Sequence, residues 1–162
     1  MARILHSYFG VIDTDIDEDD VHIWSGAVYF DDRQIPVEMC AASGQHLDLD
    51  ILNKAAYLLE TLVDTDLRAR AYIVDYCAED QSYMNRIRSI LPDQDIPTDA
   101  EHFVRSLSLY EIEIELWWAT LNDEQPRFRM LYDPDPKNKE CDEYLFLSLD
   151  MEGELLEITF EP

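Results

Sequence analysis

The spacing of apolar residues over the first 45 positions is typical of β-strands. Three runs are rich in β-branched and aromatic side chains: residues 4–12, which Gly10 interrupts, 21–30 and 34–42. The second and third runs meet at the short polar cluster 31–33, which predicts a hairpin. Because Pro36 has no N–H to donate, we expect the second arm of this hairpin to be an edge strand, at least near its start.

Helical spacing replaces this pattern after residue 47. The first helix is predicted over 48–63 by apolar residues at intervals of three and four, namely Ile51, Leu52, Ala55, Leu58, Leu59, Leu62 and Val63. A second helix is predicted over 65–91, where Pro92 ends it. Its expected apolar stripe consists of Leu67, Ala71, Val74 and Ala78 and continues through Met84, Ile87 and Leu91. A short third helix is expected over 98–107.

Strict alternation returns in the last third of the chain. Tyr110, Ile112, Ile114 and Leu116 alternate with Glu111, Glu113 and Glu115, so a strand here would carry apolar groups on one face and carboxylates on the other. Arg127 and Arg129 lie in the next predicted strand. If the two strands pair, the guanidinium groups can neutralise part of the glutamate row. Residues 144–149 and 155–160 predict a closing hairpin, with Gly153 in its turn.

The order of these elements defines the expected fold class. Strands, then helices, then strands again, in the order β-β-β-α-α-(α)-β-β-β-β, predict an α+β protein. We expect a single domain over residues 1–162, in which an antiparallel-rich sheet packs against two or three central helices. A chain of this length buries enough surface for one core.

Net charge changes what this domain is expected to bind. The chain carries 36 acidic and 12 basic residues, for a formal charge of -24, yet 47% of its residues are hydrophobic, which favours a folded protein over a disordered one. A surface of this sign repels phosphate backbones, so we expect no direct binding to nucleic acid. The same field attracts basic proteins and accelerates their association.

Several chemistries have no signature in the chain. With only four glycines, it contains neither a dinucleotide-binding turn nor a phosphate loop, and no serine lies in a nucleophile elbow. A cysteine and a histidine could form a nucleophilic pair only through the fold, and structural thiols are the favoured interpretation. We therefore expect a protein that is not an enzyme and needs no cofactor.

Cysteine spacing and the absence of a long apolar run indicate the compartment. Cys40, Cys77 and Cys141 are odd in number and far apart, which favours reduced thiols over a disulfide framework. No stretch approaches the length of a membrane-spanning helix. We expect a cytoplasmic protein without a membrane segment.

The acidic run near the N-terminus partly matches a calcium-binding loop. Asp13, Asp15 and Asp17 alternate as oxygen ligands do in such a loop, but Glu18 replaces the turn glycine and Trp24 replaces the bidentate glutamate. An EF-hand is therefore excluded, and no metal site is predicted. A nonstandard divalent-ion site over residues 13–20 remains the alternative to a solvated acidic turn.

Short motifs across most of the chain resemble a known family. They are Tyr8, Phe9 and Gly10 with Ile12 and Asp13, then Trp24 and Gly26, then Leu52, Ala55, Leu59 and Glu60, and finally an acidic strand pair around Gly153. Together they are similar to the bacterial family called domain of unknown function two thousand and four. The resemblance implies a bacterial origin and a single α+β domain. That family has no established activity or site residues.

These observations favour a non-catalytic, acidic protein-interaction module. Its most concrete form is an immunity protein that neutralises a basic bacterial toxin. The alternative is a structural or accessory domain, and a divalent-metal-dependent protein or an enzyme is the least favoured reading. The oligomeric state is left open. The predicted partner-binding residues are Asp13, Asp15, Asp17, Glu18, Asp19 and Asp20, which we favour because loops tolerate functional charge, and Glu111, Glu113 and Glu115.

Overall fold

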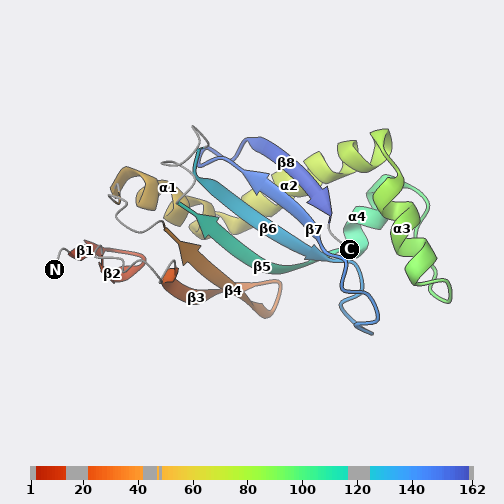
Figure 1. The fold of residues 1–162 in the computed structure, drawn as a ribbon, viewed down its shortest axis with the longest axis horizontal. Coiled ribbons are helices and arrows are strands. Elements are labelled where there is room, and N and C mark those ends of the chain that lie inside the picture. Colours follow the sequence, from red (N-terminus) through yellow and green to blue (C-terminus); the bar gives the residue numbers. More distant parts are fainter. Residues whose placement is uncertain (1–2, 14–21, 42–46, 48, 117–124, 161–162) are drawn as a thin grey trace.

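The computed structural model describes residues 3–13, 22–41, 47, 49–116 and 125–160 (Figure 1). Its strands are β1 (Arg3–His6), β2 (Gly10–Asp13), β3 (His22–Phe30), β4 (Arg33–Cys40), β5 (Ser108–Glu115), β6 (Arg127–Asp133), β7 (Leu145–Leu149) and β8 (Leu155–Phe160). Its helices are α1 (Leu49–Glu60), α2 (Leu62–Glu79), α3 (Ser82–Ile90) and α4 (Ala100–Ser106). Among the described helices, none has the length and apolar character needed to cross a membrane.

One mixed sheet organises the molecule. Its six strands follow the order β3-β4-β5-β6-β7-β8, and β1 pairs with β2 in a separate hairpin. All neighbours in the large sheet are antiparallel except β4 and β5, which are parallel because the chain passes through the helices between them. The predicted α+β class with an antiparallel-rich sheet is therefore confirmed.

The β3–β4 hairpin forms where the sequence predicts it. Asp31 and Asp32 make its turn with φ angles of 50° and 57°, a left-handed backbone that aspartate tolerates better than most residues. The prediction of an edge strand is confirmed near the start of β4 and wrong for the rest of the strand, which lies between β3 and β5. Pairing with β5 begins only at Val37, immediately after Pro36, so the missing N–H falls outside the parallel ladder.

The second predicted helix is divided in two. Asp80 adopts an extended backbone after α2, and its carboxylate accepts a 2.9 Å hydrogen bond from the N–H of Ser82, at the start of α3. Aspartate favours such local bonds over a continuing helix. The structure therefore replaces the single helix predicted over 65–91 with α2 and α3.

The buried face of α2 also differs from the predicted stripe. Leu67 is 62% exposed, and Ala71 and Ala78 are exposed as well. The residues that α2 buries are Leu62, Thr65, Asp66, Ala69, Ile73 and Cys77. Apolar spacing alone does not predict this face, because the face contains Asp66. The structure buries Asp66 together with its hydrogen-bonding partners.

Strand β5 follows its predicted alternation except at its start. Ile112, Ile114 and Leu116 are buried, as predicted. Tyr110 is 38% exposed instead, and Leu109 is buried in its place. The register between β5 and β6 shifts between Leu109 and Glu111, and this bulge reverses the faces of the residues before it.

Candidate functional site

The predicted acidic segment lies largely outside the described residues. Asp13 ends β2, and its carboxylate is 4.0 Å from Nε of Arg3. Asp15, Asp17, Glu18, Asp19 and Asp20 are not described, so their partner-binding role stays a prediction.

The glutamate row lies on the sheet face opposite α1 and α2. We call this surface the open face. Pairing places Glu38 beside Glu113, Glu113 beside Arg129, Arg129 beside Ser148 and Ser148 beside Glu157, in one row across five strands. The charged residues of the open face are Glu38, Glu111, Glu113, Glu115, Arg127, Arg129 and Glu157. Five carboxylates thus share a surface with two guanidinium groups.

Arginines on β6 neutralise part of this surface, as the sequence predicts. Nη1 of Arg129 lies 3.1 Å from Glu113 Oε2 and 3.5 Å from Glu115 Oε1. Its guanidinium also stacks on Phe146, 4.4 Å from the ring centroid. Arg127 lies beside Glu115 in the register, and its Nη1 is 3.1 Å from Glu157 Oε2. Both arginines therefore lie on the side of the glutamate row that faces β6, away from β4.

The β4 side of the row remains crowded with negative charge. Glu38 and Glu113 are direct neighbours on the parallel strands β4 and β5, a position where like charges destabilise a sheet. Burial raises the pKa of Glu111, and the charges of Glu113 and Glu38 raise it further. No ion pair joins Glu111 to another residue of the described chain. The open face therefore carries carboxylates that its own cations leave uncompensated.

The fold brings a cysteine and a histidine together beside these carboxylates. Cys40 Sγ lies 3.5 Å from His22 Nδ1, which in turn lies 3.4 Å from Glu38 Oε2. Burial raises the pKa of Cys40 to about 11, and the charges of Glu113, Glu115 and Glu38 contribute. A catalytic cysteine needs a lowered pKa, because the thiolate is the nucleophile. The electrostatics of this pair therefore oppose nucleophilic chemistry.

Neither a disulfide nor a metal cluster is present in the described part of the chain. Cys40, Cys77 and Cys141 are free thiols. Over the same residues, no group of three or more His, Cys, Asp and Glu side chains is placed to hold a metal ion.

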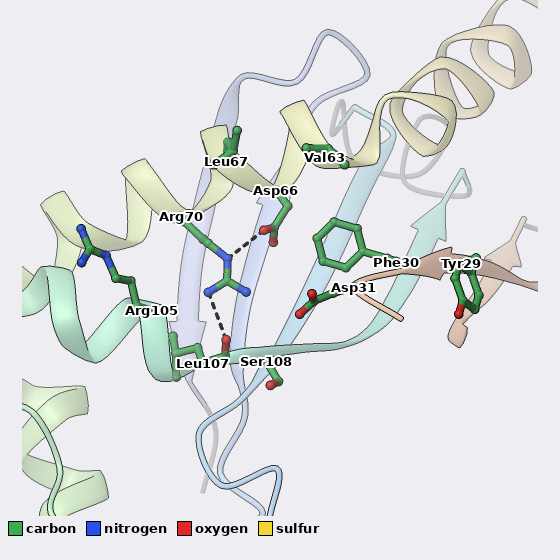
Figure 2. Close-up of a pocket in the computed structure, with 10 residues that line it drawn as sticks. All are labelled: Tyr29, Phe30, Asp31, Val63, Asp66, Leu67, Arg70, Arg105, Leu107 and Ser108. Carbon is green, nitrogen blue, oxygen red and sulfur yellow. Dashed lines mark hydrogen bonds and ion pairs between the residues drawn. The ribbon is translucent and has the colours of Figure 1, made fainter. Parts of the chain in front are cut away.

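A pocket of about 620 Å³ lies on the other side of the molecule, between α2, the β3–β4 turn and the start of β5 (Figure 2). Its walls include Tyr29, Val63 and Leu67, which are 74%, 64% and 62% exposed. Asp66 and Arg70 form an ion pair within it, with 2.8 Å between Asp66 Oδ2 and Arg70 Nε. The volume of this pocket is large enough for a small molecule. Whether the pocket could bind one depends on whether Asp66 and Arg70 are free to contact a ligand.

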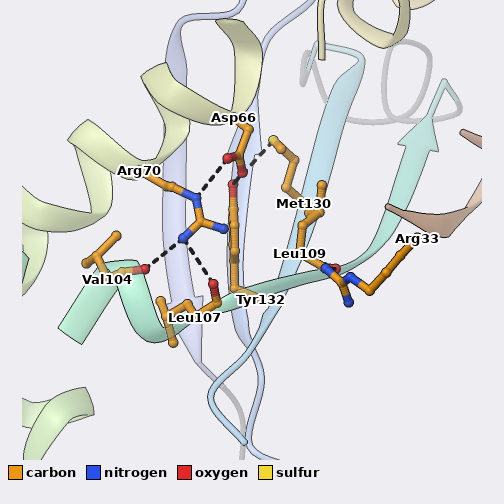
Figure 3. Close-up of polar contacts among 8 residues, drawn as sticks. All are labelled: Arg33, Asp66, Arg70, Val104, Leu107, Leu109, Met130 and Tyr132. Atoms are coloured by element: carbon orange, nitrogen blue, oxygen red, sulfur yellow. Dashed lines mark hydrogen bonds and ion pairs between the residues drawn. The ribbon is translucent and has the colours of Figure 1, made fainter. Parts of the chain in front are cut away.

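The polar groups of Asp66 and Arg70 form hydrogen bonds with other parts of the chain (Figure 3). Arg70 Nη1 donates to the carbonyl oxygens of Val104 and Leu107, at 2.7 and 3.0 Å. The hydroxyl of Tyr132 donates to Asp66 Oδ1 at 2.7 Å. This network joins α2 to the end of α4 and to β6, which is a structural role, and it explains why Asp66 can be buried.

Comparison of the chain with protein-family models, curated proteins and solved structures found no match. The resemblance to the bacterial domain family therefore stays a prediction.

Sequence reasoning identified the glutamate row but missed its neighbours. Glu38, Cys40 and His22 join Glu113 and Glu115 only because β4 and β5 pair across the intervening helices. A feature that could have pointed to Glu38 is its alternation with Val37 and Met39, which are buried. The sequence contains no comparable signal for the parallel pairing itself.

Proposed function

We propose that this protein is a non-catalytic interaction module that binds a basic protein on the open face of its sheet. The observation that carries the proposal is the cluster of Glu38, Glu111 and Glu113, of which only Glu113 lies within ion-pair distance of an arginine of the described chain. A partner that places Lys or Arg side chains here relieves a repulsion that the isolated domain retains.

The spacing of the carboxylates supports a protein partner over a single ion. Glu111, Glu113 and Glu115 follow one another at every second position of β5, about 7 Å apart along the strand. Such spacing suits several separate ammonium or guanidinium groups. Phe146 under Arg129 adds aromatic area, which is common at protein interfaces.

The most concrete form of this function is immunity, in which the acidic domain neutralises a basic toxin. A net charge of -24 speeds the encounter with a basic protein, and rapid association is what an inhibitor of a toxic enzyme requires. The module belongs to the cytoplasm in this proposal, because the toxin must be neutralised where it would act.

Affinity capture from an extract of the source cells at low salt tests the proposal. The wild-type bait is compared with a face variant, Glu38→Gln with Glu111→Gln and Glu113→Gln. A control variant removes the same charge from exposed positions on the helical side, by Glu60→Gln, Asp64→Asn and Asp93→Asn.

We expect wild type and control variant to recover the same basic protein, and the face variant to recover much less of it. The purified partner should inhibit growth when expressed alone and should lose this effect when wild type is co-expressed. Equal recovery with all three baits would remove the open face from the interaction. A further bait with Asp15→Asn, Asp17→Asn and Asp19→Asn tests the acidic segment predicted from the sequence.

A further inference from the structure

A second candidate binding surface lies at β8, the edge strand at the end of the sheet opposite β3. Within the described chain, β8 pairs only with β7, so its outer side has no strand partner, and the hydroxyl of Tyr72 bonds the backbone of Leu155 there. Helix α2 runs beside this edge (Figure 1). The helix and the strand together line a groove of about 350 Å³. The groove is lined by Tyr72, Asp75, Tyr76 and Glu79 from the helix and by Leu155, Leu156, Glu157 and Ile158 from the strand.

The helical wall presents one continuous stripe. Tyr72, Asp75, Tyr76 and Glu79 follow the spacing of three, one and three that places residues on a single helix face. The stripe extends about 10 Å along the helix, and four residues of β8 extend about 10 Å along the strand. The two walls therefore match in length and can enclose four or five residues of an extended chain.

The groove is acidic as well as aromatic. Asp75 and Glu79 are exposed, and no ion pair joins either of them to another residue of the described chain. Arg68, one turn before Tyr72, points its Nη1 toward the carbonyl oxygens of Glu152 and Gly153 instead. Glu157 directs its carboxylate to Arg127 on the open face, so it contributes backbone to the groove. The charge on the helical wall is thus negative and available to a ligand.

An unpaired strand edge beside a helix is the arrangement that binds peptides by strand addition. In that mode, backbone hydrogen bonds to the edge provide affinity, and alternate side chains point toward the helix. A lysine or arginine at such a position can lay its methylene groups against Tyr72 and Tyr76 while its charge reaches Asp75 or Glu79.

We propose that the β8–α2 groove binds an extended basic peptide segment, which adds as a seventh strand to the sheet at β8. The occupant carries Lys or Arg at every second position, on the side that faces α2. This site shares only Glu157 with the open face, through its backbone, and does not depend on the function proposed for that face.

A fluorescent heptapeptide that alternates lysine with valine provides the probe. It should bind the wild-type protein at low salt and bind about fivefold more weakly to the variant Asp75→Asn with Glu79→Gln, which loses two exposed charge interactions. The control variant Asp64→Asn with Asp93→Asn removes the same charge elsewhere and should bind as wild type does. The face variant should also bind the peptide normally, so this test is separate from the test of the open face.

Two N-methylated probes separate strand addition from simple charge attraction. One is methylated at the lysine nitrogens of the backbone and the other at the valine nitrogens, so both keep the charge of the parent. Because a β-strand directs alternate N–H groups to opposite sides, only one set can face β8. One probe should bind about tenfold or more weakly than the parent, and the other should bind equally well.

Amide hydrogen exchange on the unmodified protein locates the peptide. Exchange should slow at the unpaired amides of β8 when the parent peptide is bound, while the other sheet edge, β3, provides an internal reference. Equal binding of both methylated probes, or equal loss in the groove and control variants, would overturn the proposal. Slowed exchange at β3 without any change at β8 would overturn it as well.

Discussion

Glu38 and Glu113 stand side by side on parallel neighbouring strands, and Arg129 reaches only the second of them within ion-pair distance. Glu38 lies 3.4 Å from His22 instead, a group that is charged only when protonated. The sheet thus places two like charges at paired positions, an arrangement that disfavours strand pairing. We regard this arrangement as a binding feature, because the side chain of a basic partner can neutralise it.

Glu111 should lower the stability of the fold at neutral pH. Since burial and two neighbouring carboxylates raise its pKa, the folded protein holds this proton more tightly than the unfolded chain does. The free energy of unfolding therefore falls as the pH rises from the ordinary value of 4.5 through the raised pKa.

The variant Glu111→Gln should therefore be more stable than wild type at pH 7, by about 0.2 to 1 kcal/mol. The gain should disappear well below pH 4.5, where the carboxyl is protonated in both states. Urea unfolding across this pH range measures it. Glu140→Gln, at an exposed position, makes the same charge change and should give no comparable gain. A destabilised Glu111→Gln protein at pH 7 would contradict the electrostatic interpretation.

The two faces of β5 should respond differently to truncation. Ile114 is fully buried, so Ile114→Ala should cost about 2 to 5 kcal/mol through lost burial and a residual cavity. Glu113→Ala removes a partly exposed ion pair with Arg129 and should cost about 1 kcal/mol or less. Denaturant titration of both variants checks the assignment. Equal losses would show that the faces are misassigned.

The buried face of α2 can be tested through Asp66. The variant Asp66→Ala leaves Arg70 and the hydroxyl of Tyr132 without their partner, and should cost about 3 kcal/mol or more. Tyr132→Phe removes one hydrogen bond and should cost about 1 to 3 kcal/mol. Leu67→Ala, on the exposed face, should change the free energy of unfolding by about 0.5 kcal/mol or less. If Leu67→Ala were the most damaging change, the predicted stripe would be correct after all.

Cys40 should react slowly with thiol reagents. With a pKa of about 11, only a small fraction is thiolate at pH 8. Alkylation followed by peptide mapping should give a rate that rises toward pH 11, and Glu113→Gln should increase the rate at pH 8 by removing a nearby negative charge. A rate that saturates below pH 8 would show an activated thiol and would favour an enzyme.

Local patterns explain which parts of the fold the sequence could predict. Ile112 and Ile114 alternate with glutamates within one strand, so their burial follows from neighbours in the sequence. Burial of Asp66 depends on a hydrogen bond from the hydroxyl of Tyr132, which lies 66 positions away in the sequence. No local pattern contains that information. Because apolar spacing is a local pattern, it predicted Leu67 as a core residue of α2, although Leu67 is exposed in the structure.

The candidate site shows the same division. The proximity of Arg129 to Glu113 could be predicted, because the two lie on strands joined through a single connection in the sequence. The proximity of Glu38 to Glu113 could not, since four helices separate β4 from β5 in the chain and the register of that parallel pair is set by packing. The uncompensated part of the open face is therefore visible only in three dimensions.

The association rate of the captured partner tests the central claim most directly. Stopped-flow mixing at 0.1 M salt compares wild type, the face variant and the control variant, and is repeated at 1 M salt, where the screening length shrinks from about 10 Å to about 3 Å. We predict that the face variant associates about tenfold more slowly than the control variant at 0.1 M, and that the difference closes at 1 M. Equal association rates for the face and control variants at 0.1 M salt would contradict a docking role for Glu38, Glu111 and Glu113.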